Sequence, residues 1–173
     1  MEWPDNPFWD FSLWVYGNED VPPICLRIQE SHAADINLLL YCAWVGTRGY
    51  RLGEVDLASI VAAVDSWHRE VVVTLRNLRT RLKFDTLGAP PALVDKIRGE
   101  FKLMELNAEH CEQIMLSGAL KKRDQTVSDD VRDCAEFNMH LYLKSLGPPL
   151  QKSDLEGLAV ISSFAVDAAS SCT

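Results

Sequence analysis

Three polar residues that are close together in the sequence have side chains that could do chemistry. His32, Asp35 and Asn37 stand just before a strongly apolar segment. Imidazole titrates near neutral pH and a carboxylate can orient it, so His32 and Asp35 could bind a metal ion or transfer protons. The alternative is structural: Asp35 and Asn37 satisfy free backbone N–H groups at a helix start, and His32 hydrogen-bonds a neighbouring helix. These three residues are the candidate polar pocket.

A second set of histidines and carboxylates is spread over other predicted helices. It comprises Asp65 with His68, then Glu105, Glu109, His110 and Glu112, and finally Glu136 with His140. Di-iron bundles use Glu-x-x-His pairs, and neither Glu105 with His110 nor Glu136 with His140 has that spacing. Since solvated helix faces bring such residues together by chance, the sequence assigns no metal site.

Recognised catalytic and cofactor motifs are missing from the sequence. It contains no G-x-S-x-G, no P-loop, no G-x-G-x-x-G and no H-E-x-x-H. Ser12, Ser66 and Cys42 have no base at a spacing that a helix would bring into reach. We therefore name no catalytic residue and expect no cofactor, although a triad assembled across the fold would escape this test.

Four cations follow one side of a predicted helix and form a basic face. They are Arg69, Arg76, Arg79 and Lys83. Arginine suits bidentate contacts with anions, so this basic face could hold a phosphate-bearing ligand, RNA or an acidic protein partner. The alternative is a solvated face balanced by acidic helices such as residues 100–112. No aromatic residue is interleaved after Trp67, which argues against nucleic acid.

The pocket must be positioned by a buried helix. Residues 38–45 are apolar or weakly polar, too many for one stripe of a surface helix and too few to span a bilayer. Asp35 is a suitable N-cap, and Gly46 or Gly49 can end the helix in a left-handed conformation. We expect a central helix over about residues 35–46, with the rest of the chain packed around it.

Helical signals fill the remainder of the chain, and no strand-like alternation of useful length is seen. Asn6 with Pro7 starts an aromatic helix, Asp20 with two prolines starts a second, and apolar spacing predicts a long helix from Asp56 to Leu82 that Asp65 and Ser66 could interrupt. Further helices are expected over about 91–116, between Ser128 and Gly147, and over about 153–169. This pattern predicts an all-α fold, an irregular bundle of six or seven helices.

Length and composition indicate one helical domain over residues 1–173, with a sub-boundary at the breaker in residues 87–91. The 17 Lys and Arg residues against 25 Asp and Glu residues give a formal net charge of −8, which argues further against nucleic acid as the main partner. Five scattered cysteines without a C-x-x-C pair indicate neither a disulfide framework nor a zinc cluster. No signal peptide or transmembrane segment is recognisable, so we expect a cytoplasmic protein.

The aromatic helix that starts at Pro7 has two interpretations. Phe8, Trp9, Phe11 and Trp14 are large enough to close one end of the core. Exposed aromatic residues also mark surfaces that contact lipid or a partner. The second interpretation predicts co-sedimentation with liposomes that is lost when Trp9 and Trp14 are replaced by alanine.

Several segments resemble an uncharacterised family of small all-helical proteins from proteobacteria. They are residues 8–16, Cys25 and Leu26 followed by Gln29, residues 32–40 followed by residues 42–44, and Trp67 with residues 75–79. The resemblance covers roughly residues 8–83. It implies a bacterial cytosolic origin and a helical fold, and it implies no activity and no catalytic residue.

Two functional hypotheses follow from the sequence. The first is a non-enzymatic helical interaction or regulatory protein of the bacterial cytosol, which binds an unidentified protein partner through the basic face. The sequence favours this hypothesis over an enzyme. The second is a small-ligand-binding or metal-binding enzyme that uses the pocket around His32 and Asp35. The sequence leaves open whether the half after Pro91 closes the same core or forms a homodimer interface.

Overall fold

The computed structural model of the chain describes residues 3–119, residue 128 and residues 130–171. Its helices are α1 (Pro7–Tyr16), α2 (Val21–His32), α3 (Ile36–Thr47), α4 (Glu54–Trp67), the π-helical segment η1 (His68–Val72), α5 (Val73–Phe84), α6 (Pro91–Ser117), α7 (Val131–Ser145) and α8 (Lys152–Ser171). Because α4, η1 and α5 form one continuous helix, the described residues contain seven helices and no strand. The predicted all-α fold is confirmed.

The central helix α3 follows from its capping and its apolar sequence. Asp35 is the N-cap, and its Oδ1 atom accepts hydrogen bonds from the backbone N–H groups of Asn37 at 2.8 Å and Leu38 at 3.4 Å. Residues 38–43 are all buried, and α1, α6, α7 and α8 pack around the helix. The predicted buried central helix is therefore confirmed within one residue of its expected bounds.

The tightest helix contact in the core joins α3 to α7. Gly46 lies so close to α7 that a Cβ atom at this position would stand 2.3 Å from the Cα atom of Ala135. One turn further along α7, the side chain of Asn138 donates to the carbonyl groups of Cys42 and Tyr50 and accepts from the N–H group of Leu52. This amide fixes the segment between α3 and α4 against α7.

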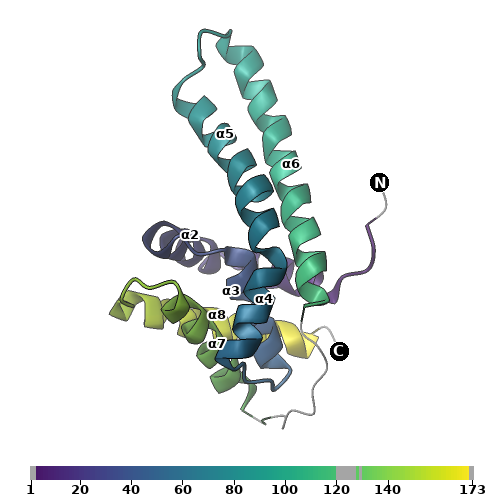
Figure 1. Cartoon of the computed structure of the whole chain (residues 1–173), viewed down its shortest axis with the longest axis vertical. Coiled ribbons are helices and arrows are strands. Elements are labelled where there is room, and N and C mark those ends of the chain that lie inside the picture. Colours follow the sequence, from purple (N-terminus) through teal and green to yellow (C-terminus); the bar gives the residue numbers. More distant parts are fainter. Residues whose placement is uncertain (1–2, 120–127, 129, 172–173) are drawn as a thin grey trace.

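Helices α5 and α6 stand side by side as a hairpin that projects from the cluster of the other helices (Figure 1). The predicted breaker at residues 87–91 forms the tip of this hairpin, since α5 ends at Phe84 and α6 begins at Pro91. The long helix predicted from Asp56 to Leu82 is one continuous helix, although its middle is π-helical over His68–Val72. The helix expected from Ser128 begins at Val131 with Asp130 as its N-cap.

No helix among the described residues is long and apolar enough to cross a membrane. In the aromatic helix α1, Phe8 and Phe11 are buried in the core, whereas Trp14 is 38% exposed and Tyr16 is 43% exposed. The rings of Phe8 and Phe11 therefore close the core as one interpretation expected, and the rings of Trp14 and Tyr16 reach the surface.

Candidate functional site

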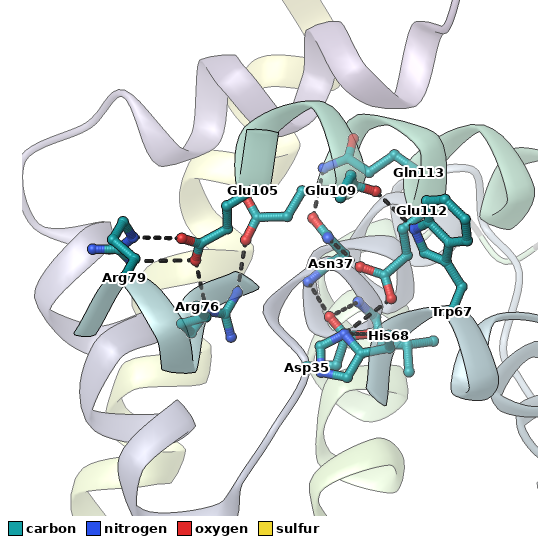
Figure 2. Close-up of polar contacts among 12 residues, drawn as sticks. Asp35, Asn37, Trp67, His68, Arg76, Arg79, Glu105, Glu109, Glu112 and Gln113 are labelled. Atoms are coloured by element: carbon teal, nitrogen blue, oxygen red, sulfur yellow. Dashed lines mark hydrogen bonds and ion pairs between the residues drawn. The ribbon is translucent and has the colours of Figure 1, made fainter. Parts of the chain in front are cut away.

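The structure brings together two buried carboxylates and one half-buried histidine from three separate elements. Asp35 precedes α3, His68 begins η1 and Glu112 lies on α6 (Figure 2). The Nδ1 atom of His68 lies 3.0 Å from Oε1 of Glu112 and 3.2 Å from Oδ2 of Asp35. One potential ligand atom from each residue falls within 4.8 Å of the others. We call Asp35, His68 and Glu112 the carboxylate–histidine centre.

Local structure explains how His68 reaches this position. A π-helical segment contains one extra residue per turn, which changes the direction of its side chains, and such segments are frequent at functional sites. Trp67, the residue before it, donates from Nε1 to the carbonyl oxygen of Ala108 at 2.9 Å. Since Ala108 lies one helical turn before Glu112, this bond places His68 directly beside Glu112.

A chain of side-chain hydrogen bonds holds Glu112 from the other side. Asn37 donates from Nδ2 to Oε2 of Glu112 at 2.6 Å, and Gln113 donates from Nε2 to Oδ1 of Asn37 at 2.8 Å. Ser12 on α1 donates to Oε1 of Gln113 at 3.0 Å. The orientation of the Glu112 carboxylate is thus fixed by residues of α1, α3 and α6.

The two oxygens of the Asp35 carboxylate have different surroundings. Its Oδ1 caps α3, and its backbone N–H donates to the hydroxyl of Tyr142 at 2.9 Å. Its Oδ2 is fully enclosed and receives no hydrogen bond from any residue that the structure describes. The side chain is 5% exposed, and this oxygen shares Nδ1 of His68, at 3.2 Å, with the closer carboxylate of Glu112.

Two ionised carboxylates this close together and buried are electrostatically unfavourable without a bound cation or a shared proton. Burial and the negative charge of Glu112 raise the pKa of Asp35 to about 7, although the charge of His68 opposes the shift. Burial lowers the pKa of His68, but the hydrogen bond to Glu112 and the charge of Asp35 outweigh it and raise the pKa overall. Two carboxylates face one imidazole, so the centre is rich in negative charge.

Two cavities flank Asp35. One, of about 280 Å³, lies between the start of α3, α4 and α7, and Asp35, His68 and Tyr142 form part of its wall. The other, of about 180 Å³, lies between α1, α3, α5 and α6, and its polar lining includes Asn37 and Arg76. The centre therefore has a cavity on each side of Asp35, and His68 lines only the larger of the two.

The structure separates the residues of the candidate polar pocket. Asp35 and Asn37 belong to the centre and its hydrogen-bond chain, whereas His32 points to α8. There His32 Nε2 lies 2.9 Å from Oδ2 of Asp154, whose other oxygen pairs with Arg27. His32 thus performs the structural task that the alternative interpretation expected, the joining of α2 to α8.

The basic face is balanced along α6 by carboxylates. Arg76 pairs with Glu105 at 2.9 Å and with Glu109 at 2.7 Å, and Arg79 pairs with Glu105 as well (Figure 2). These arginines hold the pKa of Glu105 below its ordinary value against the effect of burial. Two of the four cations of the basic face are therefore already engaged within the hairpin.

The two remaining cations of the basic face lie outside this cluster. Arg69 pairs with Asp65 at 2.7 Å on its own helix, and its side chain is 65% exposed. Lys83 is exposed near the tip, with its Nζ atom 5.4 Å from the ring centre of Phe84. The four cations therefore do not form one open basic surface.

Sequence reasoning missed His68 and Glu112 as partners of Asp35. Both had been named, but only as members of a set judged by spacing along single helices. A usable signal was present: His68 lies four residues after Val64 and Glu112 lies four residues after Ala108, which places both on the apolar sides of their helices, where ionisable residues are uncommon. Which buried polar residues meet depends on how distant helices cross, and spacing along one helix does not report this.

Comparison with known proteins gives one match. A family model described as Protein of unknown function (DUF2390) matches residues 7–116. This range extends beyond the 8–83 segment that carries the resemblance, and it contains all three residues of the carboxylate–histidine centre. Nothing among curated proteins and nothing among solved structures matches the chain.

Proposed function

The chain belongs to this family of unknown function, and we propose that it is a metal-binding protein that holds one divalent transition-metal cation at the carboxylate–histidine centre. One observation carries the proposal. The three ligand atoms from Asp35, His68 and Glu112 lie within 4.8 Å of one another, and the enclosed Oδ2 of Asp35, 3.2 Å from Nδ1 of His68, makes no hydrogen bond among the described residues.

The distances within the centre support a metal of ordinary bond length. Zinc and similar cations bind nitrogen and oxygen at about 2.0–2.2 Å, which separates neighbouring ligand atoms by roughly 2.9–3.5 Å for octahedral to tetrahedral angles. The separations of Nδ1 of His68 from Oε1 of Glu112, 3.0 Å, and from Oδ2 of Asp35, 3.2 Å, both fall in this range. A cation could therefore bind with small side-chain adjustments.

The residue types also favour a first-row divalent cation. Imidazole suits zinc and iron, and carboxylates suit manganese. Two carboxylates and a neutral imidazole would neutralise a charge of +2. The cation would replace the proton that Asp35 retains up to a pH of about 7.

The surroundings of Glu112 support the same proposal. Metal-binding carboxylates are usually held by an outer shell of hydrogen bonds, which orient them and raise metal affinity. The bonds from Asn37 to Glu112 and from Gln113 to Asn37 form such a shell.

The test is calorimetric titration of EDTA-treated protein with Mn²⁺ and Zn²⁺. We expect one equivalent to bind to the wild type, and Glu112→Gln or His68→Gln to weaken binding by at least about 100-fold. His140→Gln is the matched control, since His140 is a half-buried histidine of α7 outside the centre. If the wild type binds neither cation, or if the Glu112 and His68 variants bind as well as the control, the proposal is wrong.

The hypothesis of a protein partner at the basic face stays a prediction. Reversal of the charges at Arg76 and Arg79 would not test this hypothesis cleanly. Glutamates at these positions would face Glu105 and Glu109 and would destabilise the hairpin. Lys83, which is exposed, is the better position for a charge change in a pull-down experiment.

A further inference from the structure

We infer that the proposed metal keeps an open coordination position toward the 280 Å³ cavity between α3, α4 and α7, and that this position takes the carboxylate of a small organic acid. This inference rests on the proposed function and names the ligand class of the same site.

The number of protein ligands indicates the open position. Structural zinc sites are closed by four protein ligands, whereas catalytic sites have three and leave the next position to water or substrate. Among the described residues, only Asp35, His68 and Glu112 form a group that could hold a metal. Glu112 and Asn37 close the centre toward α6, while Asp35 and His68 form part of the wall of the 280 Å³ cavity.

The chemistry of the cavity wall indicates a carboxylate. The hydroxyl of Tyr142 accepts a hydrogen bond from the backbone N–H of Asp35. Its own proton can be donated to another oxygen, because a phenol is both donor and acceptor. A carboxylate that placed one oxygen on the metal could receive this proton on the other.

The rest of the cavity wall determines the size of the acid and the polarity of its chain. Leu38, Val61 and Leu146 line the cavity with aliphatic side chains. Its volume equals that of about nine water molecules at ~30 Å³ each. Asp65 and Arg69, which also line the cavity, pair with one another at 2.7 Å and so give no second binding point for another charge. The ligand expected is therefore a monocarboxylate with a short apolar chain.

The experiment uses Co²⁺-loaded protein, whose visible absorption reports a change of metal ligand. We expect acetate and butyrate to change the spectrum in a saturable manner, with butyrate binding roughly tenfold more tightly because two more methylene groups are buried. Val61→Phe, which fills the cavity, should retain Co²⁺ and weaken the response to butyrate at least tenfold. Ala62→Phe is the matched control, because residue 62 is exposed on the same helix and does not line this cavity.

The outcomes separate this inference from the proposed function. If Co²⁺ binds and neither acid changes the spectrum, or if the two acids bind equally, the inference is overturned while metal binding stands. An unchanged response in Val61→Phe would also overturn it. If Co²⁺ does not bind the wild type, the proposed function and this inference fail together.

Discussion

Replacement of Asp35 by asparagine should make the metal-free protein more stable, although it removes a proposed metal ligand. The amide oxygen of asparagine can accept the capping hydrogen bonds from Asn37 and Leu38, since asparagine is as good an N-cap as aspartate. Its amide nitrogen can donate to Glu112. The substitution therefore removes a buried negative charge and retains the local structure.

The magnitude follows from the titration of Asp35. In the unfolded chain this carboxyl loses its proton near pH 3.8, whereas in the folded protein it retains the proton up to about pH 7. The free energy of unfolding of the wild type therefore falls as pH rises through this window, by about 1.4 kcal/mol per pH unit and about 4 kcal/mol in total. The asparagine variant does not titrate here, so its advantage should be about 1 kcal/mol at pH 4.5 and about 4 kcal/mol at pH 8.

The assay is urea denaturation of both proteins in EDTA at pH 4.5 and pH 8, supported by thermal melts, in which 4 kcal/mol corresponds to a shift of roughly 10 °C. Asp130→Asn is the matched control, because Asp130 caps α7 from an exposed position and should change stability little at either pH. An advantage of Asp35→Asn that is equal at the two pH values, or a loss of stability at pH 8, would refute the reasoning.

Three further predictions concern the architecture. Glu105→Gln should lower the free energy of unfolding by about 1–3 kcal/mol in urea denaturation at pH 7, because it leaves two partly buried arginines without their shared carboxylate. The difference in stability between wild type and variant should disappear as pH falls and Glu105 gains its proton, and a difference that persists at low pH would contradict this. Gly46→Ala should destabilise the protein by more than about 2 kcal/mol, because its Cβ atom would collide with α7. The control Gly99→Ala, in open space on α6, should stabilise it by about 0.5–1 kcal/mol. Equal effects of the two substitutions in thermal melts would show that α7 can move away from residue 46. His32→Ala should lower stability by about 1–3 kcal/mol and leave metal affinity unchanged in calorimetry, while a loss of metal binding in the folded variant would return His32 to the functional site.

The fold was predictable because its signals are local. A run of apolar residues, an N-cap and a terminating glycine define α3, and Asn6 with Pro7 defines α1 in the same way. The π-helical segment gave no such signal, since the apolar spacing continues through residues 68–72 without a break. One inserted residue changes where His68 points while the neighbouring apolar residues remain on the inner side.

The site was predictable only in part, because its residues meet through tertiary packing. Asp35 and Asn37 were identified from their place at a helix start. His68 and Glu112 are 44 residues apart in the sequence, and their meeting depends on the crossing of η1 and α6. The pairing of His32 with Asp154 has the same origin, since the two residues are 122 positions apart. The spacing of Arg76 and Arg79 likewise predicted that they share one side of a helix, but it did not reveal which carboxylates would face them.

The most direct test of the central claim is the anomalous scattering of a crystal grown with Zn²⁺, measured on both sides of the zinc absorption edge. The account predicts one dominant peak within about 2.0–2.2 Å of an oxygen of Asp35, an oxygen of Glu112 and Nδ1 of His68. A zinc-loaded crystal whose peaks all lie at other residues, with the hydrogen bond from His68 to Glu112 unchanged, would contradict the account.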